Sequence, residues 1–192
     1  MVRLKFYLAG PEVFLPDARE IGLRKKILCE EFGFVGLYPL DNDPAFASGE
    51  ALDEKIFAAN LAFLREADAA IFNLSPFRGI NADAGTAFEL GVFAALGKPI
   101  FAYSNHSEEL FGRVAAEFGV HATPDGVHCD AGGVLIENFG NADNLMLDCA
   151  LKAQGRRVVR PDVSSPDVSP PNLGDLTGFT ACLRQARLHF GL

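Results

Sequence analysis

Two short and almost wholly apolar runs constrain the fold of this chain more than any other feature. Residues 69–74 read AAIFNL and residues 98–103 read KPIFAY. A strand without polar alternation is covered on both faces, which is typical of a central strand in a parallel sheet. The stretch between the two runs, residues 84–96, has helical character and is followed by Gly97, a residue suited to end a helix. Together these segments predict a strand–helix–strand unit.

The same alternation continues on both sides of this unit. Strands are predicted at residues 5–9 and 34–38, helices at about 16–32 and 52–67, and a fifth strand at 134–136. Strands separated by helices of this length predict an α/β fold, with a doubly wound parallel sheet and helices on both faces. Ligands of such sheets bind at the carboxyl ends of the strands, so we expect a site in the loops there.

The composition changes near residue 155, where we expect the main domain, residues 1–155, to end. The remaining part, residues 156–192, begins with a linker, because the prolines and serines from Pro161 to Pro171 do not support a regular hydrogen-bonded element. Apolar residues then recur at three- and four-residue steps from Asp175 to Phe190, which predicts a short amphipathic helix. This helix docks either on its own domain or on a neighbouring subunit.

The charge and the cysteine pattern argue against several classes of protein. The 192 residues carry a formal net charge of −8 without a long basic run, so nucleic acid is not an expected partner. No stretch approaches a membrane span, and the amino-terminal apolar run is too short for a signal peptide. The four cysteines lack the spacing of a zinc site, which favours reduced thiols, a cytoplasmic protein, and no metal or other cofactor.

Glu89 is the most unusual residue of the chain, because it stands among apolar neighbours in NADAGTAFELG, residues 81–91. Burying an unpaired carboxylate in such a helix costs several kcal/mol unless something stabilises it. Two interpretations remain open. Either the side chain faces solvent and interacts favourably with the helix dipole, or the carboxylate is kept for chemistry.

Four neighbouring residues bear on that choice. Asp83, at the loop-to-helix junction, is either a helix cap or part of a pocket rim. Asp68, at the start of the third strand, either pairs with Arg65 or joins the same rim. Tyr7, on the first strand, either packs in the core or donates its hydroxyl to one of these acids, and Gly85 lets the backbone approach a ligand. Two separated carboxyl groups without a metal motif suggest the cleavage of a glycosidic bond.

Six segments, taken in order, are specific in combination. They are YLAGPEVF (7–14), YPLDN (38–42), IFAANLAFLREADAAIFNLSPFRG (56–79), DAGTAFELG (83–91), AALGKPI (94–100) and DNLML (143–147). Over roughly residues 5–150 they resemble the nucleoside 2-deoxyribosyltransferase family. The resemblance implies a flavodoxin-like fold with a five-stranded parallel sheet, which agrees with the alternation of strands and helices.

The resemblance also implies roles for residues at matching positions. Glu89 becomes the nucleophile that holds a covalent 2-deoxyribosyl intermediate, and Tyr7 orients it by a hydrogen bond. Asp68 exchanges a proton with the nucleobase, and Asp83 binds a sugar hydroxyl. The remaining implied substrate contacts are made by Gly10, Phe14, Gly85 and Asn144. Of these, Phe14 packs against the base, and Asn144 reaches the site of an adjacent subunit, which implies a homo-oligomer with shared active sites.

The implied substrates are purine 2′-deoxynucleosides and free nucleobases, because FRGINADAGTAFE is more similar to the purine-preferring branch. A hydrolase of nucleoside 5′-monophosphates is an alternative, but Asp83 repels a phosphate unless Arg78 neutralises it. Phosphoribohydrolases that release cytokinin bases fit poorly, since their PGG run is missing before Gly85. A non-catalytic nucleotide sensor is a third alternative, and such a module does not need the Glu89 nucleophile.

Overall fold

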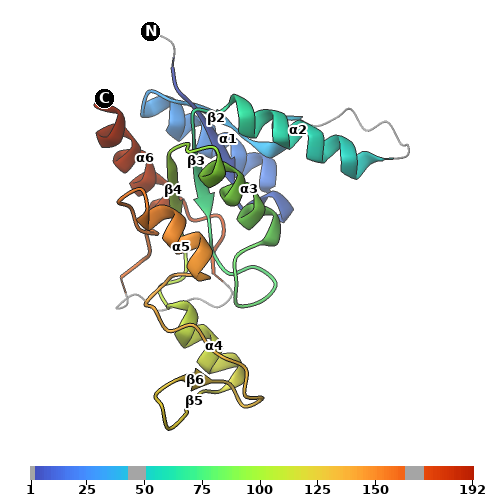
Figure 1. Cartoon of the computed structure of the whole chain (residues 1–192). Helices are drawn as coiled ribbons and strands as arrows, with labels where there is room; N and C mark the ends of the chain where they lie inside the picture. The colour runs from blue at the N-terminus through green and yellow to red at the C-terminus, as the bar shows by residue number, and fades with distance from the viewer. Residues whose placement is uncertain (1–2, 43–50, 163–170) are drawn as a thin grey trace.

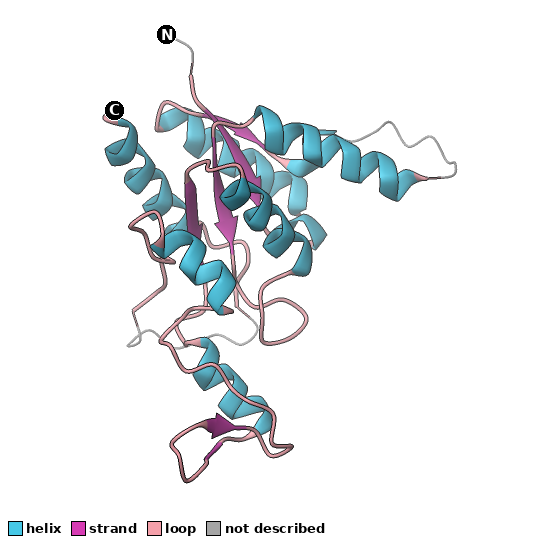
Figure 2. Cartoon of the chain, in the orientation of Figure 1, coloured by secondary structure: helices cyan, strands magenta, loops and turns pink. Residues whose placement is uncertain are grey.

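The computed structural model describes residues 3–42, 51–162 and 171–192. A four-stranded parallel sheet forms its centre, in the order β2 (Val35–Leu37), β1 (Lys5–Ala9), β3 (Ala69–Asn73), β4 (Ile100–Tyr103) (Figures 1 and 2). β1 and β3 therefore lie in the middle of the sheet, which explains why almost all of their side chains are apolar. The predicted α/β fold with a parallel sheet is confirmed, with four strands in place of five.

Helices cover both faces of the sheet. One face carries α1 (Ala18–Glu31) and α6 (Thr177–Phe190), and the other carries α2 (Leu52–Glu66), α3 (Ala84–Ala95) and α5 (Leu145–Lys152). Side chains alternate between the faces along a strand, so Phe6 and Leu8 pack toward α1 and α6. Tyr7 and Ala9 pack toward the other three helices, and Tyr7 is thereby directed at α3.

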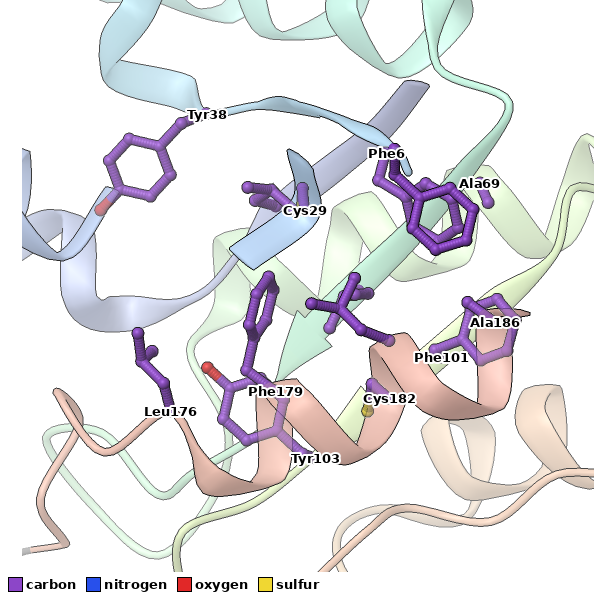
Figure 3. Packing of buried hydrophobic residues seen from close by; sticks show 14 of the residues in the cluster. Phe6, Cys29, Tyr38, Ala69, Phe101, Tyr103, Leu176, Phe179, Cys182 and Ala186 are labelled. Carbon is purple, nitrogen blue, oxygen red and sulfur yellow. The ribbon is translucent and has the colours of Figure 1, made fainter. Parts of the chain in front are cut away.

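The carboxyl-terminal helix packs on its own domain. Phe179, Cys182 and Ala186 of α6 are fully buried in the same cluster as Phe6 (Figure 3). Gly178 lies so close to the Tyr103 ring that an added Cβ would come within 2.8 Å of it. The expected boundary at residue 155 therefore does not mark the end of the hydrophobic core. Most of the expected linker, residues 163–170, lies outside the described residues.

The predicted fifth strand at residues 134–136 is wrong. Val134 and Leu135 are 64% and 72% exposed, and this segment only forms an isolated antiparallel bridge between Leu135 and Cys129. The position beside β4 is instead taken by Val159, through a single parallel bridge to Tyr103. Three apolar residues without a helix to cover them do not suffice to enter a sheet that is buried on both faces.

Several shorter elements complete the described chain. They are the 3-10 helices η1 (Pro11–Phe14) and η2 (Pro39–Asn42), the helix α4 (Leu110–Phe118), and the strands β5 (His121–Ala122) and β6 (His128–Cys129). α4 and the β5–β6 hairpin lie away from the central sheet (Figure 1). Sequence analysis did not predict these three elements or α5. Within the described ranges, no helix has both the length and the apolar character to cross a membrane.

Candidate active site

Asp83 begins helix α3 at the carboxyl edge of the sheet. Its Oδ2 accepts hydrogen bonds from the Thr86 backbone N–H, with an N–O distance of 2.9 Å, and from the Thr86 hydroxyl at 3.1 Å. This is the expected N-cap geometry, and it satisfies one of the free N–H groups of the first helical turn. The helix therefore starts at Ala84, and Glu89 falls in its second turn, on the side that faces the sheet.

Tyr7 and Glu89 meet between the sheet and α3. The Tyr7 hydroxyl donates a hydrogen bond to Glu89 Oε1, with an O–O distance of 2.5 Å. Tyr7 is fully buried in the middle of the sheet, whereas Glu89 is partly exposed. Glu89 is thus neither a wholly solvated dipole partner nor a sealed core residue.

The surroundings of Glu89 disfavour its charge. Burial raises the pKa of Glu89 to about 7, the hydrogen bond from Tyr7 lowers it, and the negative charge of Asp83 raises it further. Burial, followed by the charge of Glu89, raises the pKa of Tyr7 far above its usual value, so the phenol keeps its proton. A carboxylate that ionises near neutral pH beside a permanent hydrogen-bond donor is typical of a reactive group.

The loop before Asp83 is anchored by a buried acid. Asp143 accepts hydrogen bonds from the Ala82 backbone N–H at 2.8 Å and from Asn81 Nδ2 at 3.1 Å, and it contacts Arg113 Nη2 at 3.4 Å. The next residue, Asn144, caps α5 by accepting from the Met146 N–H at 3.0 Å. Asn144 therefore lies one residue from the group that fixes the Asp83 loop.

An aromatic pair stands at the same edge of the sheet. Phe14, at the end of η1, stacks on Phe77 of the loop after β3, with ring centroids 5.3 Å apart and planes 12° apart. The Arg78 guanidinium lies over both rings, and the Arg78 backbone adopts a left-handed φ of 53°. Phe14 is 56% exposed, so the pair offers an aromatic surface to a planar ligand. Sequence analysis did not single out Phe77, because one phenylalanine in a loop carries no pattern.

The two glycines expected at the site differ in their surroundings. Gly10 is buried, and an added Cβ would overlap the side chains of Glu12 and Asn73. Its small size is therefore needed for the packing of the turn after β1. Gly85 is exposed at the start of α3, and Asp83 Oδ2, at 3.1 Å, is the atom that an added Cβ would meet.

Asp68 lies at the opposite edge of the sheet, so the expectation that it joins Asp83 and Glu89 on one rim is wrong. It directly precedes β3, and its Oδ2 accepts the Lys5 backbone N–H at 2.8 Å at the beginning of β1. The side chain is exposed and serves to continue the pairing of the two strands. The start of a parallel strand is the end away from the ligand edge.

A cleft with a volume of about 1090 Å³ adjoins the site. It lies between the loop of residues 76–84 and α4, and Phe77, Arg78 and Asp83 contribute to its lining. Tyr7 and Glu89 are not part of that lining, whereas Asp83, whose charge acts on Glu89, is.

Comparison with known proteins identifies the family of this chain. The family model described as nucleoside 2-deoxyribosyltransferase matches residues 6–146. The chain belongs to the nucleoside 2-deoxyribosyltransferase family. As a member of this family, the protein is an enzyme of the transferase class.

Individual proteins are similar to this chain in sequence or in fold. A 2-desoxiribosyltransferase from Leishmania mexicana is 35% identical and superposes with a TM-score of 0.57 over 75% of this chain and 85% of that chain. An uncharacterized protein of Schizosaccharomyces pombe is 30% identical over 163 residues, 78% of this chain and 77% of that protein. A conserved protein from Enterococcus faecalis, at 17% identity, a TM-score of 0.56, and coverage of 96% and 99%, shares the fold.

Proposed function

We propose that this protein transfers 2-deoxyribose between nucleobases through a covalent intermediate on Glu89, with purine 2′-deoxynucleosides as substrates. The observation that carries the proposal is the contact between Glu89 and Tyr7, in which a partly exposed carboxylate of raised pKa is held by a neutral donor. A nucleophile toward an anomeric carbon has to be ionised, poorly solvated and fixed in place. Glu89 meets these conditions near neutral pH.

In the first half-reaction, an oxygen of the Glu89 carboxylate forms a bond to C1′ of the sugar as the bond between C1′ and the base nitrogen breaks. The base leaves with the bonding electron pair and takes up a proton. In the second half-reaction, a nitrogen of another base attacks C1′, releases the Glu89 carboxylate and loses its proton. Tyr7 keeps its proton throughout and donates to the carboxylate. Asp68 takes no part in this scheme, because it lies at the far edge of the sheet.

Asp83 supports an unphosphorylated substrate. Its Oδ2 is engaged by Thr86, and within the described residues no hydrogen bond is made by its Oδ1, which is available to a sugar hydroxyl. The negative charge of Asp83 would repel a phosphate dianion at the same place. Arg78 stacks on the aromatic pair, which favours a role in packing over neutralisation of Asp83.

The proposed purine preference draws on the aromatic pair. A two-ring base covers more of the Phe14 ring than a single ring does and gains more from stacking.

We further propose a homo-oligomer with active sites completed by a neighbouring subunit. Phe57 of α2 and Phe88, the residue before Glu89, contact each other with ring centroids 6.1 Å apart. They are 53% and 52% exposed, and α2 extends beyond the body of the protein (Figure 1). An exposed apolar pair beside the nucleophile suits a subunit contact. Sedimentation of the wild type against Phe57→Asp tests the assembly, and a wild type that sediments as a monomer contradicts it.

The central experiment is to incubate the protein with deoxyinosine and adenine and to separate the products by chromatography. Deoxyadenosine is expected, whereas release of deoxyribose with hypoxanthine points to hydrolysis. Rapid denaturation during turnover, followed by mass spectrometry, should find a 2-deoxyribosyl group on the peptide that contains Glu89. Faster reaction of deoxyinosine 5′-monophosphate than of deoxyinosine would overturn the role of Asp83. Binding without any turnover would indicate a sensor.

A further inference from the structure

A row of buried polar side chains runs beneath the carboxyl ends of the strands. Lys25 of α1 forms an ion pair with Glu12 of η1, and both side chains are fully buried. Glu12 Oε2 accepts a hydrogen bond from Asn73 Nδ2 at 2.9 Å, and Asn73 Oδ1 accepts from the Ser75 hydroxyl at 2.6 Å and from the Ser75 N–H at 3.1 Å. Asn73 and Ser75 are also fully buried. The row therefore joins η1 to the loop after β3 through groups that are costly to leave unpaired.

The row continues to the carboxyl-terminal segment. Asn105, which follows β4, donates its backbone N–H to the Ser75 hydroxyl oxygen at 2.8 Å. Its side-chain amide donates to the carbonyl oxygens of Asn172 at 2.7 Å and Asp175 at 3.0 Å. These two carbonyls belong to the segment before α6, and the buried side chains of α6 fix the helix on the sheet. Ser75 is thereby connected to α6 as well as to η1.

Two members of the row, Glu12 and Ser75, lie close in sequence to the aromatic pair. Phe14 lies two residues after Glu12, and Phe77 lies two residues after Ser75. The ring of Phe14 is more than half exposed, so packing in the core does not hold it. The stacking of the two rings depends instead on the relative position of η1 and the loop after β3. That position is set by the hydrogen bonds between Glu12, Asn73 and Ser75.

We propose that Ser75 and Asn105 are positioning residues for the nucleobase subsite. Ser75 holds Phe77 in its position against Phe14. Asn105 links Ser75 to residues 171–176, so that this segment also stabilises the subsite. The inference rests on the proposed function, in which a nucleobase stacks on this aromatic pair. It extends the functional unit into a carboxyl-terminal segment that lies beyond residues 6–146, the range that the family model matches.

Titration calorimetry of the full chain with adenine tests the inference without requiring turnover. Ser75→Ala removes one of the two donors to Asn73 Oδ1 and the acceptor of the Asn105 N–H, and we expect adenine to bind about tenfold more weakly. Ser75→Thr keeps the hydroxyl and should restore the affinity. Asn105→Ala removes the donor to the carbonyl oxygens of Asn172 and Asp175 and should weaken binding in the same direction.

Ser104→Ala is the matched control. Ser104 directly follows β4, is buried, and accepts a hydrogen bond from the His106 backbone N–H at 3.2 Å. Its loss should lower the melting temperature, as Ser75→Ala does, but should leave the adenine affinity unchanged. Equal affinity of Ser75→Ala and wild type, equal weakening in Ser104→Ala, or a wild type that does not bind adenine would each overturn the inference. If adenine binding follows the expected pattern but no base exchange occurs, the inference stands and the proposed function fails.

Discussion

Two glutamates lie near the carboxyl ends of the strands, one on each face of the sheet. Their charged and hydrogen-bonding neighbours differ. On the α1–α6 face, Glu12 is fully buried, pairs with the Lys25 ammonium and accepts a hydrogen bond from Asn73. On the other face, Glu89 accepts a hydrogen bond from the neutral Tyr7 and lies near the negative charge of Asp83. A carboxylate that is neutralised by a cation holds the structure together, whereas one left without a cation retains its reactivity.

The largest expected effect is on activity. Glu89→Ala should lower the rate of base exchange by at least about 10⁴-fold, because the carboxylate that bonds to C1′ is gone. The rate is measured by chromatography with deoxyinosine and adenine. Urea unfolding of the variant should still be cooperative, which shows that the loss is chemical. A variant that retains a tenth or more of the wild-type rate would place the nucleophile elsewhere.

The same truncation on the other face should act on stability. Glu12→Ala leaves the Lys25 amino group, whose pKa burial lowers to about 7, without its partner, so the free energy of unfolding should fall by about 3–5 kcal/mol. Urea denaturation measures the loss. Replacing both partners, with Glu12→Leu and Lys25→Met, should cost less than Glu12→Ala alone, since no charge then remains buried. A larger loss in the double variant would contradict the interpretation of this pair as a charge that needs compensation.

Replacing each glutamate by glutamine removes only its charge, and the effect on the free energy of unfolding should have opposite signs for Glu89 and Glu12. The folded state raises the pKa of Glu89 from 4.5 to about 7, so the folding contribution of Glu89 is complete below pH 4.5 and is lost as the pH rises through 7. Glu89→Gln should therefore stabilise the protein at pH 8 by about 2 kcal/mol, allowing for the partial exposure of the side chain, and by little at pH 4.5. Glu12→Gln should destabilise it at both pH values. Equal effects of Glu89→Gln at the two pH values would refute the raised pKa.

The sequence predicts a feature well when residues close together in the chain determine it, and poorly when the feature depends on contacts between distant segments. The apolar runs of β3 and β4 predict central strands, because burial on both faces leaves a local composition signal. The pairing of Glu12 with Lys25 leaves none, since it forms only when α1 folds back over the sheet. The carboxylate of Glu12, among the apolar residues of YLAGPEVF, is nevertheless a visible signal of the same kind as Glu89.

At the site, too, local features can be predicted from the sequence and contacts between distant segments cannot. The N-cap role of Asp83 is local and was among the expected alternatives, and its geometry agrees. The placement of Asp68 failed although the sequence contained the information, because a residue that precedes a parallel strand lies at the edge opposite the ligand. The stacking of Phe14 on Phe77 joins η1 to a loop more than sixty positions further along the chain, a distance at which a single sequence carries no pattern.

The smallest expected effects are shifts in the pH dependence of kcat/KM, which should rise with pH as Glu89 ionises and level off above about 7. Tyr7→Phe removes the hydrogen bond that lowers the pKa of Glu89, so the rise should move to higher pH. Asp83→Asn removes a negative charge that raises this pKa, so the rise should move to lower pH, each by about one unit or less. Asp68→Asn is the same chemical change at the far edge of the sheet and should leave the pH profile unchanged.

Opposite shifts in Tyr7→Phe and Asp83→Asn, together with no shift in Asp68→Asn, identify Glu89 as the titrating group. A general loss of stability cannot move the profile in opposite directions in the first two variants. Shifts of the same sign would mean that the acid limb of the profile belongs to a different group.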